Sequence, residues 1–350
     1  MKGIRSLFIA LAAVFLGLLA GAILMLSTGA NPFEGFSYLF RGGLMNIERV
    51  GNTLATATTL ILTGLSATFA FRTGLFSIGA AGQMLMGGLV VTALGLTVQL
   101  PKIAMLPLLI VAGALAGAVW GFIPGILKAR FNVHEVVSTI MMNWIAYWTV
   151  YYTVPAYFKA PYIETESARI PDYASLKVAW IEKLFSGSSL NLGIFIAIAC
   201  TIVIALILNR MVLGFELKAV GFNRFAAEYA GMNVPRNMAL SMAISGALAG
   251  LGGVTFYVGY AVNMQIGVLP PQGIDGIAVA LLGATSPIGV FLSALFFGIL
   301  HSGKGFMSAM TDIPPEIGDT IIATIIYFAA TGVLFTRLWD SIHARLQRKK

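Results

Sequence analysis

The chain has 350 residues, of which 58% are hydrophobic and only 10% are charged, and its net charge is +8. A soluble globular protein carries about 25% charged residues, so this charged minority could not keep so much apolar surface in solution. The composition therefore excludes a soluble enzyme, a DNA-binding protein and a disordered chain, and it leaves a polytopic membrane protein.

Ten apolar runs follow one another along the chain, and a helix that crosses a bilayer needs about 20 such residues. Runs of this length favour helices over barrel strands, so the predicted fold class is an all-α polytopic membrane protein in one domain, 1–350. We expect the spans near residues 7–27, 53–71, 75–97, 104–127, 136–158, 191–209, 238–260, 274–285, 287–303 and 318–336.

Three of these runs need separate comment. The first is longer than the apolar core of about 7–15 residues in a signal peptide and has no small-residue cleavage site after it, so we expect a retained anchor. The eighth and ninth are short and are separated by Ser286 and Pro287, which indicates broken or half-spanning helices.

Charged residues divide unequally between the two sides that ten alternating spans create. With both termini in the cytoplasm, the inner segments hold fourteen bases and four acids, a net charge of +10, and the outer segments hold eight bases and ten acids, a net charge of −2. A Lys/Arg excess marks the cytoplasmic side, so we expect both termini inside. The +8 charge thus describes orientation and gives no reason to expect nucleic acid as a partner. The largest outer segment, 159–190, is expected to be an extracellular loop.

The predicted spans contain no acid or base near a centre, since Glu135, Asp275 and His301 lie at predicted ends. Ion-coupled carriers usually place ionisable groups at membrane depth, so the energy for any transport would enter elsewhere. The segment 298–305 matches the start of a phosphate-binding loop, but Gly305 stands where that motif has Ser or Thr. We therefore expect no nucleotide site. With one cysteine and three scattered histidines, we also expect no metal site and no catalytic apparatus.

Neutral polar residues at membrane depth have two interpretations. They bond neighbouring helices or their own backbone, or they line a path for a neutral polar solute such as a sugar or a base. Nearby aromatic residues would stack on a base, although an aromatic belt at the membrane interface explains them equally well. The candidates for a solute path are Gln83, Thr139, Asn143, Trp144, Asn263 and Gln265.

Glycines recur at four-residue spacing, which allows helix backbones to approach closely. The pentapeptide GALAG occurs twice, at 113–117 and 246–250. Both copies begin regions of similar composition, which suggests an internal duplication.

A cytoplasmic loop at 214–236 carries the clearest local signal. Asn223 is a good N-cap for a short helix over 224–230, Gly231 is suited to end it, and Arg224 and Glu228 are spaced for an i,i+4 pair. Such a rigid amphipathic helix with an exposed aromatic face suggests docking to a soluble partner. The docking residues expected are Gly221, Asn223, Arg224, Phe225, Ala226, Ala227, Glu228, Tyr229 and Gly231.

The residues around this loop carry a resemblance to a known family. Residues 216–253 read ELKAVGFNRFAAEYAGMNVPRNMALSMAISGALAGLGG and resemble the coupling loop of ABC importer permeases for simple sugars, nucleosides and branched-chain amino acids. Residues 69–88, FAFRTGLFSIGAAGQMLMGG, and 131–148, FNVHEVVSTIMMNWIAYW, resemble the nucleoside branch. Ser77 and Ala81 stand where that branch commonly has Asn and Glu, so no role for that acid carries over.

The resemblance implies a permease of the bacterial cell membrane that imports nucleosides and is not itself an enzyme. It implies a second homologous permease, a cytoplasmic ATPase that is often in tandem form, and an extracellular substrate-binding lipoprotein. This chain would bind no cofactor itself, because ATP and magnesium belong to the ATPase. Two alternatives stay open: cargo of ribose or another simple sugar, and a facilitator that works alone.

Overall fold

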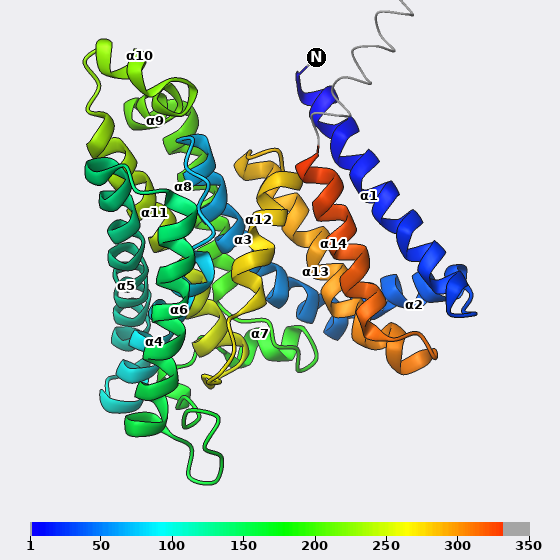
Figure 1. The fold of residues 1–350 in the computed structure, drawn as a ribbon. Coiled ribbons are helices and arrows are strands. Elements are labelled where there is room, and N and C mark those ends of the chain that lie inside the picture. The colour runs from blue at the N-terminus through cyan, green and yellow to red at the C-terminus, as the bar shows by residue number, and fades with distance from the viewer. Residues whose placement is uncertain (1, 332–350) are drawn as a thin grey trace, which may run out of the picture.

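The computed structural model describes residues 2–331, which form fourteen α-helices (Figure 1). The first seven are α1 (Lys2–Ser27), α2 (Pro32–Leu44), α3 (Ile47–Arg72), α4 (Ala80–Thr97), α5 (Lys102–Phe131), α6 (Glu135–Thr153) and α7 (Ala179–Leu184). The others are α8 (Gly193–Arg210), α9 (Val212–Phe222), α10 (Arg224–Tyr229), α11 (Val234–Thr255), α12 (Pro271–Leu282), α13 (Pro287–Met310) and α14 (Pro315–Ala330). A π-helical turn, η3 (Phe256–Tyr260), continues α11.

Seven of the described helices are long and apolar enough to cross a membrane: α1, α3, α4, α5, α8, α11 with η3, and α13. The prediction of an all-α polytopic membrane protein is therefore confirmed. The other three predicted spans correspond to α6, α12 and α14. Residues 332–336 of the last predicted span, and the inner charges at Arg337, Asp340, Arg345, Arg348, Lys349 and Lys350, lie outside the described residues.

Two elements differ from the prediction. The helix α2 was not expected, because its 13 residues are too few to give the signal of a membrane span. At its start, Asn31 accepts a hydrogen bond from the Phe33 N–H, and Pro32 is the first helical residue. The expected short ninth span is wrong, since α13 continues to Met310 over 24 residues. Its neighbour α12 is short, as predicted, with 12 residues.

The helices define two ends of the molecule (Figure 1). The N-terminal end of α1, the C-terminal end of α14 and the helices α9 and α10 lie at one end, which we name the α10 end. The helices α2 and α7 lie at the other, which we name the α7 end. The chain turns between α12 and α13 through two consecutive left-handed residues, Ala284 at φ 50° and Thr285 at φ 52°, before Pro287 begins α13.

The two GALAG copies lie against each other in the contact between α5 and α11. A Cβ atom added to Gly117 would lie 2.2 Å from the Gly246 carbonyl oxygen, and one added to Gly250 would lie 2.3 Å from the Gly113 carbonyl oxygen. The helices run antiparallel, so Gly121 completes the seam opposite Gly246. We name these five glycines the glycine seam. The seam confirms the predicted close packing, while the duplication stays a prediction.

Candidate functional site

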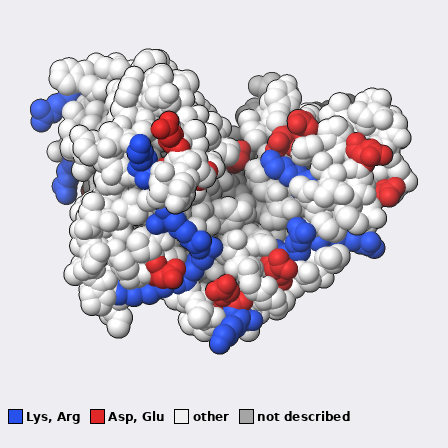
Figure 2. Space-filling view, turned by 90° about the horizontal axis from the view of Figure 1, so that it is seen from below, with Lys and Arg blue, Asp and Glu red and all other residues white. Residues whose placement is uncertain are grey.

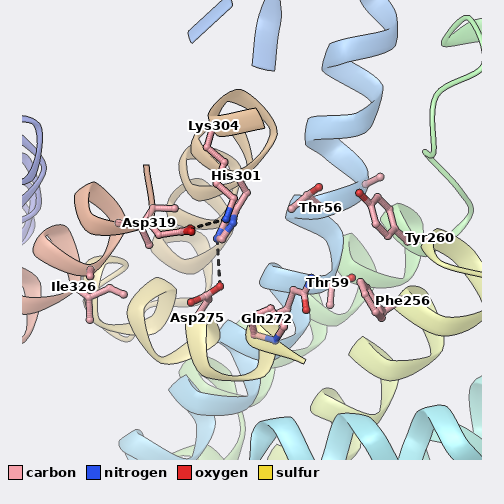
Figure 3. A pocket seen from close by; sticks show the side chains of 14 residues that line it. Thr56, Thr59, Phe256, Tyr260, Gln272, Asp275, His301, Lys304, Asp319 and Ile326 are labelled. Carbon is pink, nitrogen blue, oxygen red and sulfur yellow. Dashed lines mark hydrogen bonds and ion pairs between the residues drawn. The ribbon is translucent and has the colours of Figure 1, made fainter. Parts of the chain in front are cut away.

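A cavity of about 600 Å³ lies between five elements, α3, η3, α12, α13 and α14 (Figure 3). Its lining residues Thr56 and Asp319 belong to the first halves of α3 and α14, and both helices begin toward the α7 end (Figure 1). A surface view of that end shows the molecule hollowed between two lobes, with acidic and basic side chains along the rim (Figure 2). The main polar and aromatic lining residues are Thr56 and Thr59 of α3, Phe256 and Tyr260 of η3, Gln272 and Asp275 of α12, His301 and Lys304 of α13, and Asp319 of α14.

Two ion pairs occupy one side of this cavity. His301 Nε2 lies 3.2 Å from Asp275 Oδ2, and Lys304 Nζ lies 2.5 Å from Asp319 Oδ1. The sequence placed Asp275 and His301 at separate span ends and offered no cluster. The tight turn between α12 and α13 was the available signal, because helices joined by a short turn lie antiparallel and side by side.

The opposite side of the cavity is aromatic and neutral (Figure 3). The rings of Phe256 and Tyr260 are stacked, with centroids 5.7 Å apart and planes inclined by 20°. Between the two sides, the buried Oε1 of Gln272 accepts no hydrogen bond from the described residues. An unpaired buried amide oxygen is costly, and this one is shielded from the interior of the cavity by its neighbours.

A second cavity of about 400 Å³ shares Phe256, Tyr260 and Gln272 with the first. Two of the predicted path residues, Asn263 and Gln265, line it. Their side-chain amides donate to the two carboxylate oxygens of Glu166, at 2.6 Å and 3.1 Å. These bonds fasten the segment 159–190 to the segment 261–270 beside the cavity.

The other four predicted path residues lie elsewhere. Asn143 accepts from the Gly82 N–H at 2.9 Å and donates to the Ile78 carbonyl at 2.9 Å, so it holds the turn that precedes α4. Thr139 accepts from the Ile78 N–H in the same turn. Gln83 is buried, and its Oε1 has no partner among the described residues. Trp144 is 48% exposed on the outer surface of α6. A part in the solute path stays a prediction for these four.

The predicted helix of the 214–236 loop is present as α10 at the α10 end (Figure 1). Asn223 Oδ1 accepts from the N–H groups of Phe225 and Ala226, which confirms the cap, and Gly231 has φ +81°. Ala227 is buried beneath the helix, whereas Phe225 is 60% and Tyr229 is 95% exposed. The helix thus presents an aromatic face that nothing in the described chain covers.

The predicted pair between Arg224 and Glu228 is wrong. The Arg224 guanidinium donates to Asn132 at the end of α5 and lies over the Phe225 ring, 4.9 Å from its centroid. Asn132 is left-handed, at φ 52°, and the turn it makes carries its amide to α10.

The loop is in direct contact with the membrane helices at the end of α9. A Cβ atom on Gly221 would lie 2.4 Å from the Arg72 carbonyl oxygen and 3.0 Å from the Gly74 nitrogen, so α9 packs on the corner between α3 and α4. Arg72 Nε then donates to the Thr285 carbonyl at 2.8 Å, in the corner between α12 and α13. Burial and the Arg72 charge lower the pKa of Lys218 on α9. One continuous path of contacts therefore joins α9 to the helix that carries Asp275.

Among residues 2–331, no group of three or more His, Cys, Asp or Glu side chains could hold a metal ion. The four ionisable groups of the 600 Å³ cavity form two separate pairs instead.

Comparison with known proteins covers nearly the whole chain. Residues 49–330 match the family model described as branched-chain amino acid transport system / permease component. The guanosine ABC transporter permease protein NupP of Bacillus subtilis is 42% identical over 333 residues, 95% of each chain. The nucleoside ABC transporter permease protein NupB of Lactococcus lactis is 40% identical over 93% of this chain and 91% of its own.

A more distant relative belongs to the same organism as the first. The guanosine ABC transporter permease protein NupQ of Bacillus subtilis is 29% identical over 71% of this chain and 79% of its own. No solved structure matches the chain.

Proposed function

This chain belongs to the family of branched-chain amino acid transport system permease components, and from that premise we propose that it is a membrane subunit of an ATP-driven importer of nucleosides. The similarity along the whole chain to permeases named for guanosine and for nucleosides carries the proposal. The cavity agrees with it, because its stacked rings and neutral amide suit a base.

The importer needs three further components. NupP and NupQ are two homologous guanosine permeases of one organism, which supports a second, homologous permease beside this chain. An ATPase carrying ATP and magnesium would bind α10, so the α10 end faces the cytoplasm. An extracellular lipoprotein would deliver solute at the α7 end, where the cavities lie. The predicted charge bias supports the same orientation.

Uptake by the complete importer tests the cargo. We expect cells that lack other nucleoside uptake to accumulate labelled guanosine when they express this chain with its second permease, ATPase and lipoprotein. This accumulation should stop when the ATPase is inactivated. Uptake of ribose but not of guanosine would reject the cargo. Nucleoside movement by the purified chain alone in liposomes would instead support the stand-alone facilitator.

A second experiment tests docking at α10. We expect Ala226→Arg or Glu228→Arg to abolish co-purification of the ATPase and uptake, because each adds a long cation to the exposed face. Membrane insertion should be unchanged. Glu164→Arg, at an exposed position in the segment 159–190, is the matched control. Normal uptake in both α10 variants would reject the docking assignment.

A further inference from the structure

The chemistry of the 600 Å³ cavity narrows the class of solute it accepts. Small-molecule sites typically measure about 300–1,000 Å³, so the volume suits a ligand of nucleoside size. The stacked rings of Phe256 and Tyr260 offer an aromatic surface on one side. A planar base that stacked there would bury apolar area at little conformational cost.

The facing side offers acceptors to a ligand. Asp275 Oδ2 lies 3.2 Å from His301 Nε2, and a carboxylate has lone pairs for further donors. Gln272 Oε1, one turn earlier on α12, is buried and accepts nothing from the described residues. Asp275 is therefore the acceptor that faces the aromatic pair across the cavity, and Gln272 lies between them (Figure 3).

The charges of the cavity lining exclude phosphorylated solutes. Lys304 is paired with Asp319, so its positive charge is already neutralised. His301 lies 3.2 Å from Asp275, so each basic side chain of this lining already has an acid beside it. A phosphate monoester bears about −1.5 to −2 charges at neutral pH and would find no unpaired cation in this lining.

We propose that this cavity binds an unphosphorylated purine nucleoside, with its base on the Phe256–Tyr260 pair and its N–H edge on Asp275. Guanine matches best among the common bases, because N1–H and the N2 amino group are adjacent donors that one carboxylate accepts together. This assignment rests on the proposed function and adds to it the residues that recognise the cargo.

Equilibrium binding to the membrane part of the importer tests the assignment. The full chain, assembled with its second permease and without the lipoprotein, is incubated with labelled guanosine and competed with adenosine, guanosine monophosphate or ribose. We expect guanosine to compete at least about tenfold better than guanosine monophosphate, because the two share the same base contacts and differ only in a phosphate for which the lining has no unpaired cation. Equal competition by the monophosphate would overturn the proposal.

A single-residue variant tests whether Asp275 recognises the nucleoside. Asp275→Asn should weaken guanosine binding about tenfold or more and adenosine binding less, because adenine presents one donor and one acceptor on that edge. Asp312→Asn, an exposed acid after α13 and outside the cavity, is the matched control. Guanosine binding by Asp275→Asn that equals the control would overturn the proposal.

The Phe256–Tyr260 pair supplies a test that does not depend on the folding of the Asp275 variant. Tyr260→Phe keeps the ring and should bind guanosine as the unaltered chain does, whereas Tyr260→Ala should lose binding. Equal binding by both Tyr260 variants would overturn the proposal. Import of guanosine by the complete transporter without binding at the cavity would reject this inference and leave the proposed function standing. Failure to import any nucleoside would reject the function itself.

Discussion

Single side chains decide where the docking surface begins and how it is held. Asn223 bonds two backbone N–H groups of α10 that have no partner inside so short a helix. This cap was predictable because it depends on neighbouring residues alone. The partner of Arg224 was not, since Asn132 is 92 residues away and reaches α10 only because α5 ends in a left-handed turn.

Removing the cap should loosen α10 without changing its aromatic face. We expect Asn223→Ala to cost about 1 kcal/mol of local stability and to speed amide exchange over residues 225–229. Asn223→Asp keeps an acceptor and should behave as the unaltered chain does. Hydrogen exchange measured by mass spectrometry, with co-purification of the ATPase as a second readout, checks this. Unchanged exchange in Asn223→Ala would show that packing alone forms the helix.

At the scale of elements, helix existence followed from apolar runs, but helix pairing did not. The glycine spacing predicted close contacts and could not say which helices would meet. In the structure α5 meets α11 largely through bare backbone, because four of the five seam glycines lie under a carbonyl of the other helix, while Gly113 lies under the Val254 side chain. The helix α2 was missed since its length gives no span signal, and its cap residue Asn31 and the following Pro32 were the local indications.

The glycine seam predicts how much stability different glycine variants lose. We expect Gly117→Ala and Gly246→Ala each to lose about 1–3 kcal/mol, because the new Cβ would lie 2.2 Å from a backbone oxygen that cannot move alone. Gly305→Ala on α13 is the control, since its Cβ would contact nothing within 4 Å, and it should be neutral or slightly stabilising. Thermal unfolding of the purified chain in detergent measures the order. Equal melting temperatures for Gly246→Ala and Gly305→Ala would contradict it.

At the scale of the whole molecule, the contacts from α9 through Arg72 to Thr285 connect the α10 end with the corner before α13. That corner has two left-handed residues in succession, and such residues persist only where the surroundings hold them. The Arg72 bond to the Thr285 carbonyl is one such support. The cavity beyond this corner draws its lining from positions between 55 and 326, so no local pattern could have revealed it.

This connection predicts a variant that binds the ATPase but transports poorly. We expect Arg72→Lys to keep the positive charge and the bound ATPase, yet to lower uptake about tenfold, because Lys has no Nε–H to hold the Thr285 carbonyl. The ratio of ATP hydrolysed to guanosine imported should rise in reconstituted transporters. Arg236→Lys, on α11 near the same end, serves as the control. An unchanged ratio in Arg72→Lys would show that coupling takes another route.

The glycine seam also limits how this chain can change over generations. A clash created by a larger residue is usually repaired by a smaller one opposite it, but opposite Gly117, Gly246 and Gly250 the residue is already glycine and nothing smaller exists. Second-site suppressors of variants at these three positions should therefore be absent from α5 and α11, whereas the exposed Leu115 and Val119 between the seam positions should tolerate replacement. A saturation scan would then show intolerance at every fourth position on both helices.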